Sequence, residues 1–228
     1  MSELAASIEA SNLQSMTIYD FPVGPYPTRV RIAIAEKNLQ DKVRFEMVDL
    51  YKGEHKRSDF IEQKNYSGTL PVLELADGTL IAECTAITQY LDTLDGSPSL
   101  TGTTPLEQGT IHMMSKRAEI EMLDAISTYF HHGTPGLGPS VELYQNPEWG
   151  FRQRDKAVRG MLYFDKLLQR QSFIAGEKFS MADITVIGGL VFAAIVKLDV
   201  PQECEALLAW FERMKTRESV KSQPAFSG

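Results

Sequence analysis

The stretch LPVLELADGTLIAECTAITQYLD, residues 70–92, decides the fold of this chain of 228 residues. Two apolar runs in it, LPVLEL and TLIAE, flank the short turn ADG, and this pattern is typical of a β-hairpin. Residues 84–94 follow with the spacing of a helix. Pro71 stands at the first residue of a strand that should be central, a position where a strand tolerates proline and where a tight bend often uses the cis isomer.

Towards the amino terminus, the pattern changes its period several times. TIYDF, residues 17–21, is a short β-rich run that Pro22 ends, and TRVRIAIAEKN, residues 28–38, predicts a helix. Residues 43–48 have the period of two that is typical of a half-buried strand. With the polar segment before Pro71, the order is β-α-β-(α)-β-β-α, which is the thioredoxin-like plan.

Towards the carboxyl terminus, no strand pattern returns after residues 95–105, whose composition is that of a linker. Helical spacing occurs in residues 106–132, 147–170, 181–198 and 202–216. In FSMADI, Ser180 and Asp183 have the positions of a capping box, which predicts a helix start there. We therefore predict an α/β, thioredoxin-like domain at residues 16–95, a linker at residues 96–105 and an all-helical domain at residues 106–228.

The composition excludes several classes of protein. The formal net charge of −7 and the pI of about 5.2 argue against binding to nucleic acid or to a membrane surface, because such proteins usually carry a basic face. Two cysteines are too few for a disulfide scaffold, and no His/Cys cluster indicates a metal. We therefore expect a reducing, cytoplasmic compartment and neither a metal nor a bound cofactor.

Two segments could be mistaken for a targeting signal or a membrane span. Residues 1–15 contain two glutamates and no Lys or Arg, which fits neither a secretory signal nor a transit peptide, so we expect a mobile tail. The longest apolar run, residues 184–196, is shorter than the ~20 residues that span a bilayer. It predicts a buried core helix.

Four motifs of the chain resemble those of cytosolic glutathione transferases, in the same order along the sequence. They are GPYPTRVRIAIAEKN (residues 24–38), GEHKRSDFIEQKNYSGTLPVLEL (residues 53–75), DGTLIAECTAITQYLD (residues 77–92) and FIAGEKFSMADITV (residues 173–186). The resemblance implies the layout of that family, a thioredoxin-like domain that binds glutathione, followed by a helical domain. It also implies a homodimer, with glutathione as a co-substrate.

The resemblance to the delta and phi classes of this family implies a glutathione site. His55 and Lys56 match the positions that bind the glycyl carboxylate. Leu70, just before Pro71, would offer its main chain to the cysteinyl moiety. The positions of the family's Glu-Ser pair, which holds the γ-glutamyl group at a helix start, fall on Glu83 and Cys84.

Cys84 departs from the serine that the family usually has at this position. Its backbone N–H can still bind a carboxylate, because a helix N-terminus attracts anions, but its thiol is a weak donor. A side-chain contact and a contact through the backbone alone both stay open. We do not expect a nucleophilic role, because the cysteine-type members of the family place that residue at the first helix.

Most of the family activates the glutathione thiol with a Tyr at the end of the first strand, or with a Ser or Cys at the start of the first helix. In this chain the first position falls on Asp20 and the second on Gly24. An ionised Asp only accepts hydrogen bonds and Gly has no side chain, so neither can do the usual job. Tyr19 would face the other side of the strand, and Tyr26 remains a minor candidate.

Ser127 and His131 lie four residues apart, on one flank of the helix expected at residues 106–132. Spacing alone favours a serine bonded to its own backbone and a histidine stabilised by the helix C-terminus. The chain is, however, most similar to a fungal-type class of the family, in which Ser and His of this helix hold a water against the glutathione sulfur and the first helix starts with a small residue. Gly24, Ser127 and His131 match that class. The resemblance therefore implies that a water held by Ser127 and His131 activates the thiol, with help from the first helix.

The expected function is conjugation of glutathione to hydrophobic electrophiles, which is a detoxification reaction. We expect the electrophile to bind between the two domains, near Tyr26, Tyr129 and Phe130. One alternative is a glutathione-dependent peroxidase, and another is a non-catalytic subunit that binds ligands or has a regulatory role. The presence of His55, Lys56 and Glu83 argues against the non-catalytic subunit, because a scaffold has no need of them.

Overall fold

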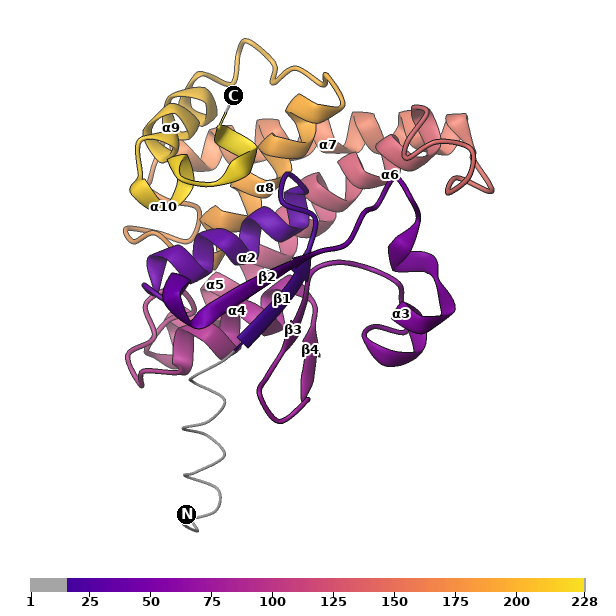
Figure 1. Cartoon of the computed structure of the whole chain (residues 1–228). Coiled ribbons are helices and arrows are strands. Elements are labelled where there is room, and N and C mark those ends of the chain that lie inside the picture. Colours follow the sequence, from indigo (N-terminus) through magenta and orange to yellow (C-terminus); the bar gives the residue numbers. More distant parts are fainter. Residues whose placement is uncertain (1–15, 228) are drawn as a thin grey trace.

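A four-stranded mixed sheet forms the first part of the protein, whose structure is a computed structural model that describes residues 16–227 (Figure 1). The strand order is β2-β1-β3-β4, with β1 parallel to β2 and antiparallel to β3. The strands are β1 Met16–Asp20, β2 Val43–Met47, β3 Val72–Glu74 and β4 Leu80–Ala82. β3 and β4 form the predicted hairpin, and the Leu70–Pro71 peptide bond is cis. The tail expected at residues 1–15 lies outside the described residues.

Helices of the first domain cover this sheet. The α-helices are α2 Pro25–Glu36, α3 Ser58–Gln63 and α4 Cys84–Thr93, and 3₁₀ turns occur at Gln40–Lys42 and Glu54–Lys56. α2 and α4 pack together, and their apolar side chains share one core with β1 and β3. α2 begins earlier than predicted, because Pro25 suits the first helical position, where its missing N–H costs nothing. The order βαβαββα confirms the thioredoxin-like plan.

The second domain is entirely helical in the part of the chain that the structure describes. Its helices are α5 Pro105–Ala118, α6 Asp124–Gly133, α7 Pro147–Leu168, α8 Met181–Ile195, α9 Glu205–Lys215 and α10 Glu218–Lys221, with a 3₁₀ turn at Pro224–Phe226. α5 therefore starts on Pro105, the last residue of the expected linker. α8 is the predicted core helix, and the Asp183 carboxylate at its start accepts hydrogen bonds from the N–H and the hydroxyl of Ser180, both at 2.9 Å.

The single helix predicted for residues 106–132 is interrupted by a π-helical turn, Glu119–Leu123. The turn packs against α7 and α8. At Gly160 of α7 the approach is so close that a Cβ would lie 2.6 Å from the carbonyl oxygen of Glu121. The prediction of one continuous α-helix was wrong because a π turn inserts a residue while the apolar stripe continues, so periodicity does not reveal it.

The two domains meet where α2 lies against α8 (Figure 1). Arg29 of α2 is only 2% exposed and reaches into the helical domain. Its guanidinium donates to Glu119 Oε2 at 3.1 Å and to Thr185 Oγ1 at 3.0 Å. This contact ties the start of α2 to the helical domain. Within residues 16–227, no helix has the length and apolar character needed to cross a membrane.

Candidate functional site

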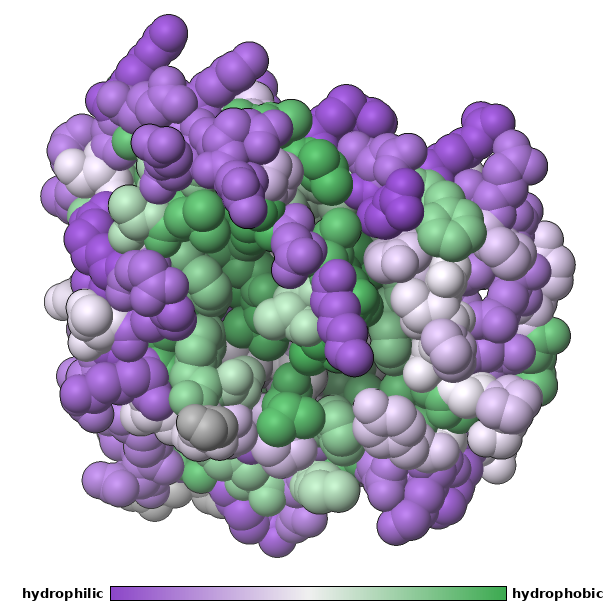
Figure 2. Space-filling model, turned by 90° about the horizontal axis from the view of Figure 1, so that it is seen from above, coloured by the Kyte–Doolittle hydropathy of each residue, from purple (hydrophilic) through white to green (hydrophobic). Residues whose placement is uncertain are grey.

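A cavity of about 1420 Å³ lies between the two domains. Figure 2 shows a face of the molecule on which apolar side chains gather in a hollow, with polar side chains around it. The structure brings together every residue that the sequence assigns to glutathione binding and to activation of the thiol. Those that line the cavity are Gly24, His55, Lys56, Leu70, Pro71, Glu83, Cys84, Ser127 and His131.

His55 and Lys56 reach the cavity from the 3₁₀ turn Glu54–Lys56. His55 is 5% exposed, and its Nδ1 is buried without a hydrogen-bond partner among the described residues. Burial, and then the charge of Lys56, lowers the pKa of His55 from 6.5 to about 4, so it is neutral at pH 7. Unpaired buried N–H groups are rare, which favours the tautomer with the proton on Nε2. His55 then acts as a neutral donor.

Lys56 is the cation of this pair. Its Nζ donates to the carbonyl oxygen of Gly68 at 2.8 Å, which holds the long side chain in one orientation. Burial lowers the pKa of Lys56 from its usual value, and the Glu142 carboxylate opposes that change. The ammonium group and the neutral His55 together can bind one carboxylate, because one supplies charge and the other a directed N–H.

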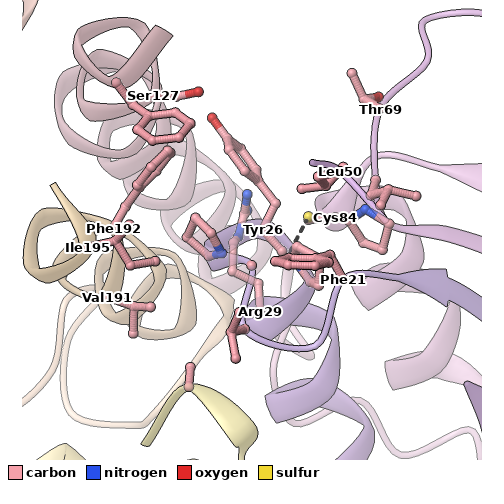
Figure 3. Close-up of a pocket in the computed structure, with 18 of the residues that line it drawn as sticks. Phe21, Tyr26, Arg29, Leu50, Thr69, Cys84, Ser127, Val191, Phe192 and Ile195 are labelled. Atoms are coloured by element: carbon pink, nitrogen blue, oxygen red, sulfur yellow. Dashed lines mark hydrogen bonds between the residues drawn. The ribbon is translucent and has the colours of Figure 1, made fainter. Parts of the chain in front are cut away.

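Glu83 and Cys84 stand at the start of α4. Glu83 has φ 70° and ψ 121°, a strained conformation for a residue with a side chain, and such strain concentrates at functional sites. The Cys84 thiol donates to the carbonyl oxygen of Tyr26 at 3.4 Å, and burial raises its pKa to about 11. The thiol is therefore neutral and turned towards α2 (Figure 3), which leaves the backbone N–H of Cys84 as the donor for a ligand.

Asp20 and Tyr19 do not reach the cavity. Asp20 is fully buried and accepts hydrogen bonds from Arg31 Nε at 2.5 Å and from a terminal nitrogen of the same guanidinium at 3.2 Å. The Tyr19 hydroxyl donates to Glu74 Oε2 at 2.6 Å. Neither residue is among those that line the cavity, so neither can donate to a ligand sulfur there.

Tyr26 lines the cavity, but its hydroxyl proton is already used. The hydroxyl donates to Asp124 Oδ1 at 2.7 Å. Burial, and then the negative charge of Asp124, raises the pKa of Tyr26 well above its usual value. A tyrosine that donates to a buried carboxylate cannot also donate to a thiolate, which argues against Tyr26 as the activating residue.

Gly24 precedes α2, whose first turn is poor in hydrogen-bond donors. Pro25 and Pro27 have no N–H, so among the first three helical residues only Tyr26 can donate from the backbone. At Gly24 a Cβ would lie 3.0 Å from both the Phe21 carbonyl oxygen and Pro27 Cδ. A small residue is therefore needed for packing at this position, and the helix offers one N–H together with its dipole.

Ser127 and His131 face the cavity from α6. The Ser127 hydroxyl lies beside that of Tyr26 (Figure 3), and its hydrogen bonding partly offsets the rise in the pKa of Tyr26. His131 Nδ1 lies 2.7 Å from Glu142 Oε1. Sequence reasoning missed both Glu142 and Asp124. Glu142 stands in the loop between α6 and α7, where no periodicity predicts a contact, whereas Asp124 lies one helical turn before Ser127 and could have been noticed.

Another part of the cavity wall is apolar. Phe130 and Phe192 pack with their ring centres 5.4 Å apart, and Phe192 also meets the ring of Tyr26 at 6.5 Å. Other apolar residues that line this side are Val191, Ile195, Phe211, Ala225 and Phe226. Tyr129 was predicted to line the cavity, and this was wrong: about 100° further around the helix from Phe130, it packs on Phe151 with ring centres 5.9 Å apart.

Comparison with known proteins identifies the family. Residues 23–94 match the model of the glutathione S-transferase N-terminal domain, and residues 125–218 match that of the C-terminal domain. The chain belongs to the glutathione transferase family. Residues 16–227 contain no group of three or more side chains placed to hold a metal ion.

Two well-matched relatives of this transferase come from a yeast and a bacterium. Glutathione S-transferase 2 of Saccharomyces cerevisiae is 69% identical over 208 residues, which cover 91% of this chain and 89% of that protein. The crystal structure of Gtt2 from the same yeast superposes with a TM-score of 0.89 at 68% identity, covering 90% of this chain and 98% of the other. A glutathione S-transferase domain-containing protein of Marinobacter aquaeolei has a TM-score of 0.87 at 48% identity, covering 90% and 99%.

Proposed function

We propose that this transferase conjugates the thiolate of glutathione to hydrophobic electrophiles, and that a water held by Ser127 and His131 activates the thiol. The observation that carries the proposal is the hydrogen bond from His131 Nδ1 to Glu142 Oε1, at 2.7 Å. It leaves Nε2 of His131 as an acceptor on a residue that lines the cavity.

Energetics support a water rather than the helix alone. A free cysteine thiol has a pKa near 8.5, and lowering it by ~2 units needs about 2.7 kcal/mol. A helix N-terminus supplies up to ~1–2 kcal/mol, and α2 has a single N–H in its first three positions. A hydrogen bond to the charged sulfur supplies ~1.5–3 kcal/mol more. The helix N-terminus and the hydrogen bond together can supply about 2.7 kcal/mol, whereas neither of them supplies it alone at the lower end of its range.

The proposed pose of glutathione follows the polar groups around the cavity. The glycyl carboxylate binds to Lys56 and to the Nε2–H of His55. The cysteinyl moiety pairs with the main chain of Leu70, before the cis bond to Pro71. The γ-glutamyl group binds at the start of α4, where its amine meets the Glu83 carboxylate and its carboxylate meets the backbone N–H of Cys84.

The proposed second substrate is a hydrophobic electrophile that binds against the apolar wall. Phe130 and Phe192 give this wall two aromatic faces, on which a planar aromatic electrophile can stack. A detoxification role, a cytoplasmic location and a homodimer belong to the same proposal. The resemblance to the family supports them.

The test replaces the two residues that hold the water. The Ser127→Ala/His131→Ala double variant should lower the conjugation rate with a chlorodinitrobenzene by roughly 10²–10⁴-fold, the usual contribution of general acid–base catalysis. The ultraviolet absorbance of enzyme-bound thiolate should fall in parallel. A matched control is His132→Ala, because His132 is not among the residues that line the cavity. Unchanged rate and unchanged thiolate absorbance in the double variant would contradict the proposed activation.

A further inference from the structure

Glu142 places its carboxylate against the imidazole of His131. It belongs to the loop between α6 and α7, and its side chain is only 9% exposed. Oε1 lies 2.7 Å from His131 Nδ1 and accepts the N–H of Leu137 at 2.9 Å. The loop wraps closely around this side chain, because a Cβ at Gly136 would lie 2.3 Å from the same oxygen. The carboxylate is therefore held by its own loop, independently of His131.

This contact determines which nitrogen of His131 carries the proton. A carboxylate accepts hydrogen bonds and cannot donate them, so the Nδ1···Oε1 contact places the proton on Nδ1. In the neutral imidazole, Nε2 is then an unprotonated acceptor. A base whose ring is held by a carboxylate has the arrangement in which one group fixes the tautomer and balances the charge that forms on the ring.

A second carboxylate, that of Asp124, sets the direction of the hydrogen bond that the Ser127 hydroxyl makes. The Tyr26 hydroxyl donates to Asp124, so its oxygen can accept the hydrogen of the neighbouring Ser127 hydroxyl (Figure 3). Ser127 then presents a lone pair. A water between Ser127 and His131 meets two acceptors and donates to both. Its own lone pairs are left for the proton of the thiol.

The charged groups around Glu142 come from the glycyl side of the site. Lys56 attracts the Glu142 carboxylate, and His55 is close enough for both His131 and Glu142 to affect its protonation. The negative charge of Glu142 opposes binding of another anion at His55 and Lys56. Its removal should therefore leave the affinity for glutathione unchanged or raise it.

We propose that Glu142 is a positioning residue for thiol activation, which holds His131 in the tautomer and orientation that let Nε2 take a proton from the bound water. This inference rests on the proposed function, in which Ser127 and His131 hold that water. In the step, the S–H bond of glutathione breaks and its proton passes to the water, while one proton of the water passes to Nε2. The products are a thiolate, a water and an imidazolium ion whose charge Glu142 balances.

The decisive variant is Glu142→Gln, which keeps the size of the side chain and removes its charge. We expect kcat with glutathione and a chlorodinitrobenzene to fall roughly ten- to hundredfold, part of the 10²–10⁴-fold that a general base contributes. KM for glutathione should stay the same or fall. The midpoint of the thiolate absorbance titration of bound glutathione should move to higher pH, and a merely structural role of Glu142 would not produce this shift.

A matched control separates positioning from anchoring of the loop. Gln145 anchors the same loop, because its Nε2 donates to the carbonyl oxygens of His131 at 2.7 Å and of Thr134 at 2.8 Å, without contact to the imidazole. Gln145→Ala should therefore leave kcat and the thiolate titration close to those of the wild type. His131→Ala, measured beside it, reports on the proposed function itself.

Each outcome bears on one of the two proposals. A loss of kcat in Glu142→Gln with the shifted titration and an unaffected Gln145→Ala supports the positioning role. Wild-type kinetics in Glu142→Gln, with a clear loss in His131→Ala, overturn the role of Glu142 and leave the proposed function standing. Equal losses of kcat in Glu142→Gln and Gln145→Ala show that Glu142 only anchors the loop, and they also overturn its positioning role. Wild-type kinetics in His131→Ala overturn both proposals.

Discussion

At the scale of single residues, burial sets the charge of the two groups that we propose as the site of the glycyl carboxylate. His55 is neutral because protonation would place a second cation, largely cut off from water, beside Lys56. The resulting pair combines one charge with one neutral donor. A neutral His55 also has a consequence for stability, because the same side chain titrates near its ordinary pKa once the chain unfolds.

We expect part of the free energy of unfolding to be lost as the pH falls from about 6.5 to about 4. The pKa of His55 is lowered to about 4 in the folded protein, so over this range the unfolded chain binds a proton that the folded chain does not. The loss attributable to His55 is on the order of 2–3 kcal/mol. Urea unfolding at a series of pH values should show that the free energy of unfolding depends less steeply on pH in His55→Asn than in the wild type. Parallel curves would contradict the assignment.

The sequence predicted the residues of the site that belong to a motif, and it missed Asp124 in a helix and Glu142 in a loop. His55, Lys56, Glu83 and Cys84 stand in segments with a family pattern, and all of them line the cavity. Glu142 is held by the N–H of Leu137 and by His131, two contacts that arise only when the loop folds back over α6. The periodic spacing of residues in a sequence does not reveal that a loop folds back over the helix before it.

At the scale of elements, the π turn Glu119–Leu123 shows how close packing determines local winding. It lies where α7 packs closely against the α5–α6 segment, with Gly160 at the contact. The turn also carries Glu119, the partner of Arg29. The extra residue of a π turn rotates the helix that follows, and that helix presents Ser127 and His131 to the cavity.

Gly160→Ala should destabilise the protein by about 1–3 kcal/mol, because the new Cβ would lie 2.6 Å from the carbonyl oxygen of Glu121 and overpack the contact. Gly109→Ala is the matched control. Gly109 is exposed in α5 and has no atom within 4 Å of the added Cβ, so its helix propensity should raise the stability by up to ~1 kcal/mol. Thermal unfolding of both variants measures the two effects. Equal changes of the same sign would show that the contact at Gly160 is unimportant.

Element types followed from the sequence more reliably than element ends. Alternation and helical periodicity predicted β1, β2, the hairpin and the helices, because these patterns reflect which side faces a core. The start of α2 and the break between α5 and α6 depend on backbone chemistry and on neighbouring helices instead. Tyr129 shows the same limit for side chains, since a step of one residue turned it away from the cavity.

At the scale of the whole molecule, the site exists only because the two domains are held together. The first domain supplies the residues assigned to glutathione binding, and the second supplies Ser127, His131 and the apolar wall. Arg29 crosses the interface between them, with 2% exposure, to reach Glu119 and Thr185. Sequence patterns predicted both domains but not this crossing, because a buried arginine in an amphipathic helix looks like a surface residue.

Arg29→Met should therefore lower the free energy of unfolding by roughly 3 kcal/mol, since it removes a buried cation and leaves the largely buried Glu119 carboxylate with only the exposed Lys116 as its cationic partner. The control is Lys178→Met, because the Lys178 side chain is 82% exposed and its ion pair with Glu107 lies at the surface, where such a pair is worth about 0–1 kcal/mol. Urea unfolding monitored by tryptophan fluorescence compares them. A loss in Arg29→Met no larger than in the control would show that the domains are held elsewhere.

The two prolines at the start of α2 affect the balance between the acidity of the glutathione thiol and the nucleophilicity of its thiolate. A thiolate surrounded by many donors is abundant but sluggish, since intrinsic nucleophilicity falls as the pKa of the thiol falls. Pro25 and Pro27 leave one amide, that of Tyr26, to face an incoming sulfur. In the proposed mechanism, the proton acceptor acts through water, so that a single water rather than a fixed side-chain donor is hydrogen-bonded to the anion. The sulfur so generated keeps its electron pairs available for attack on carbon.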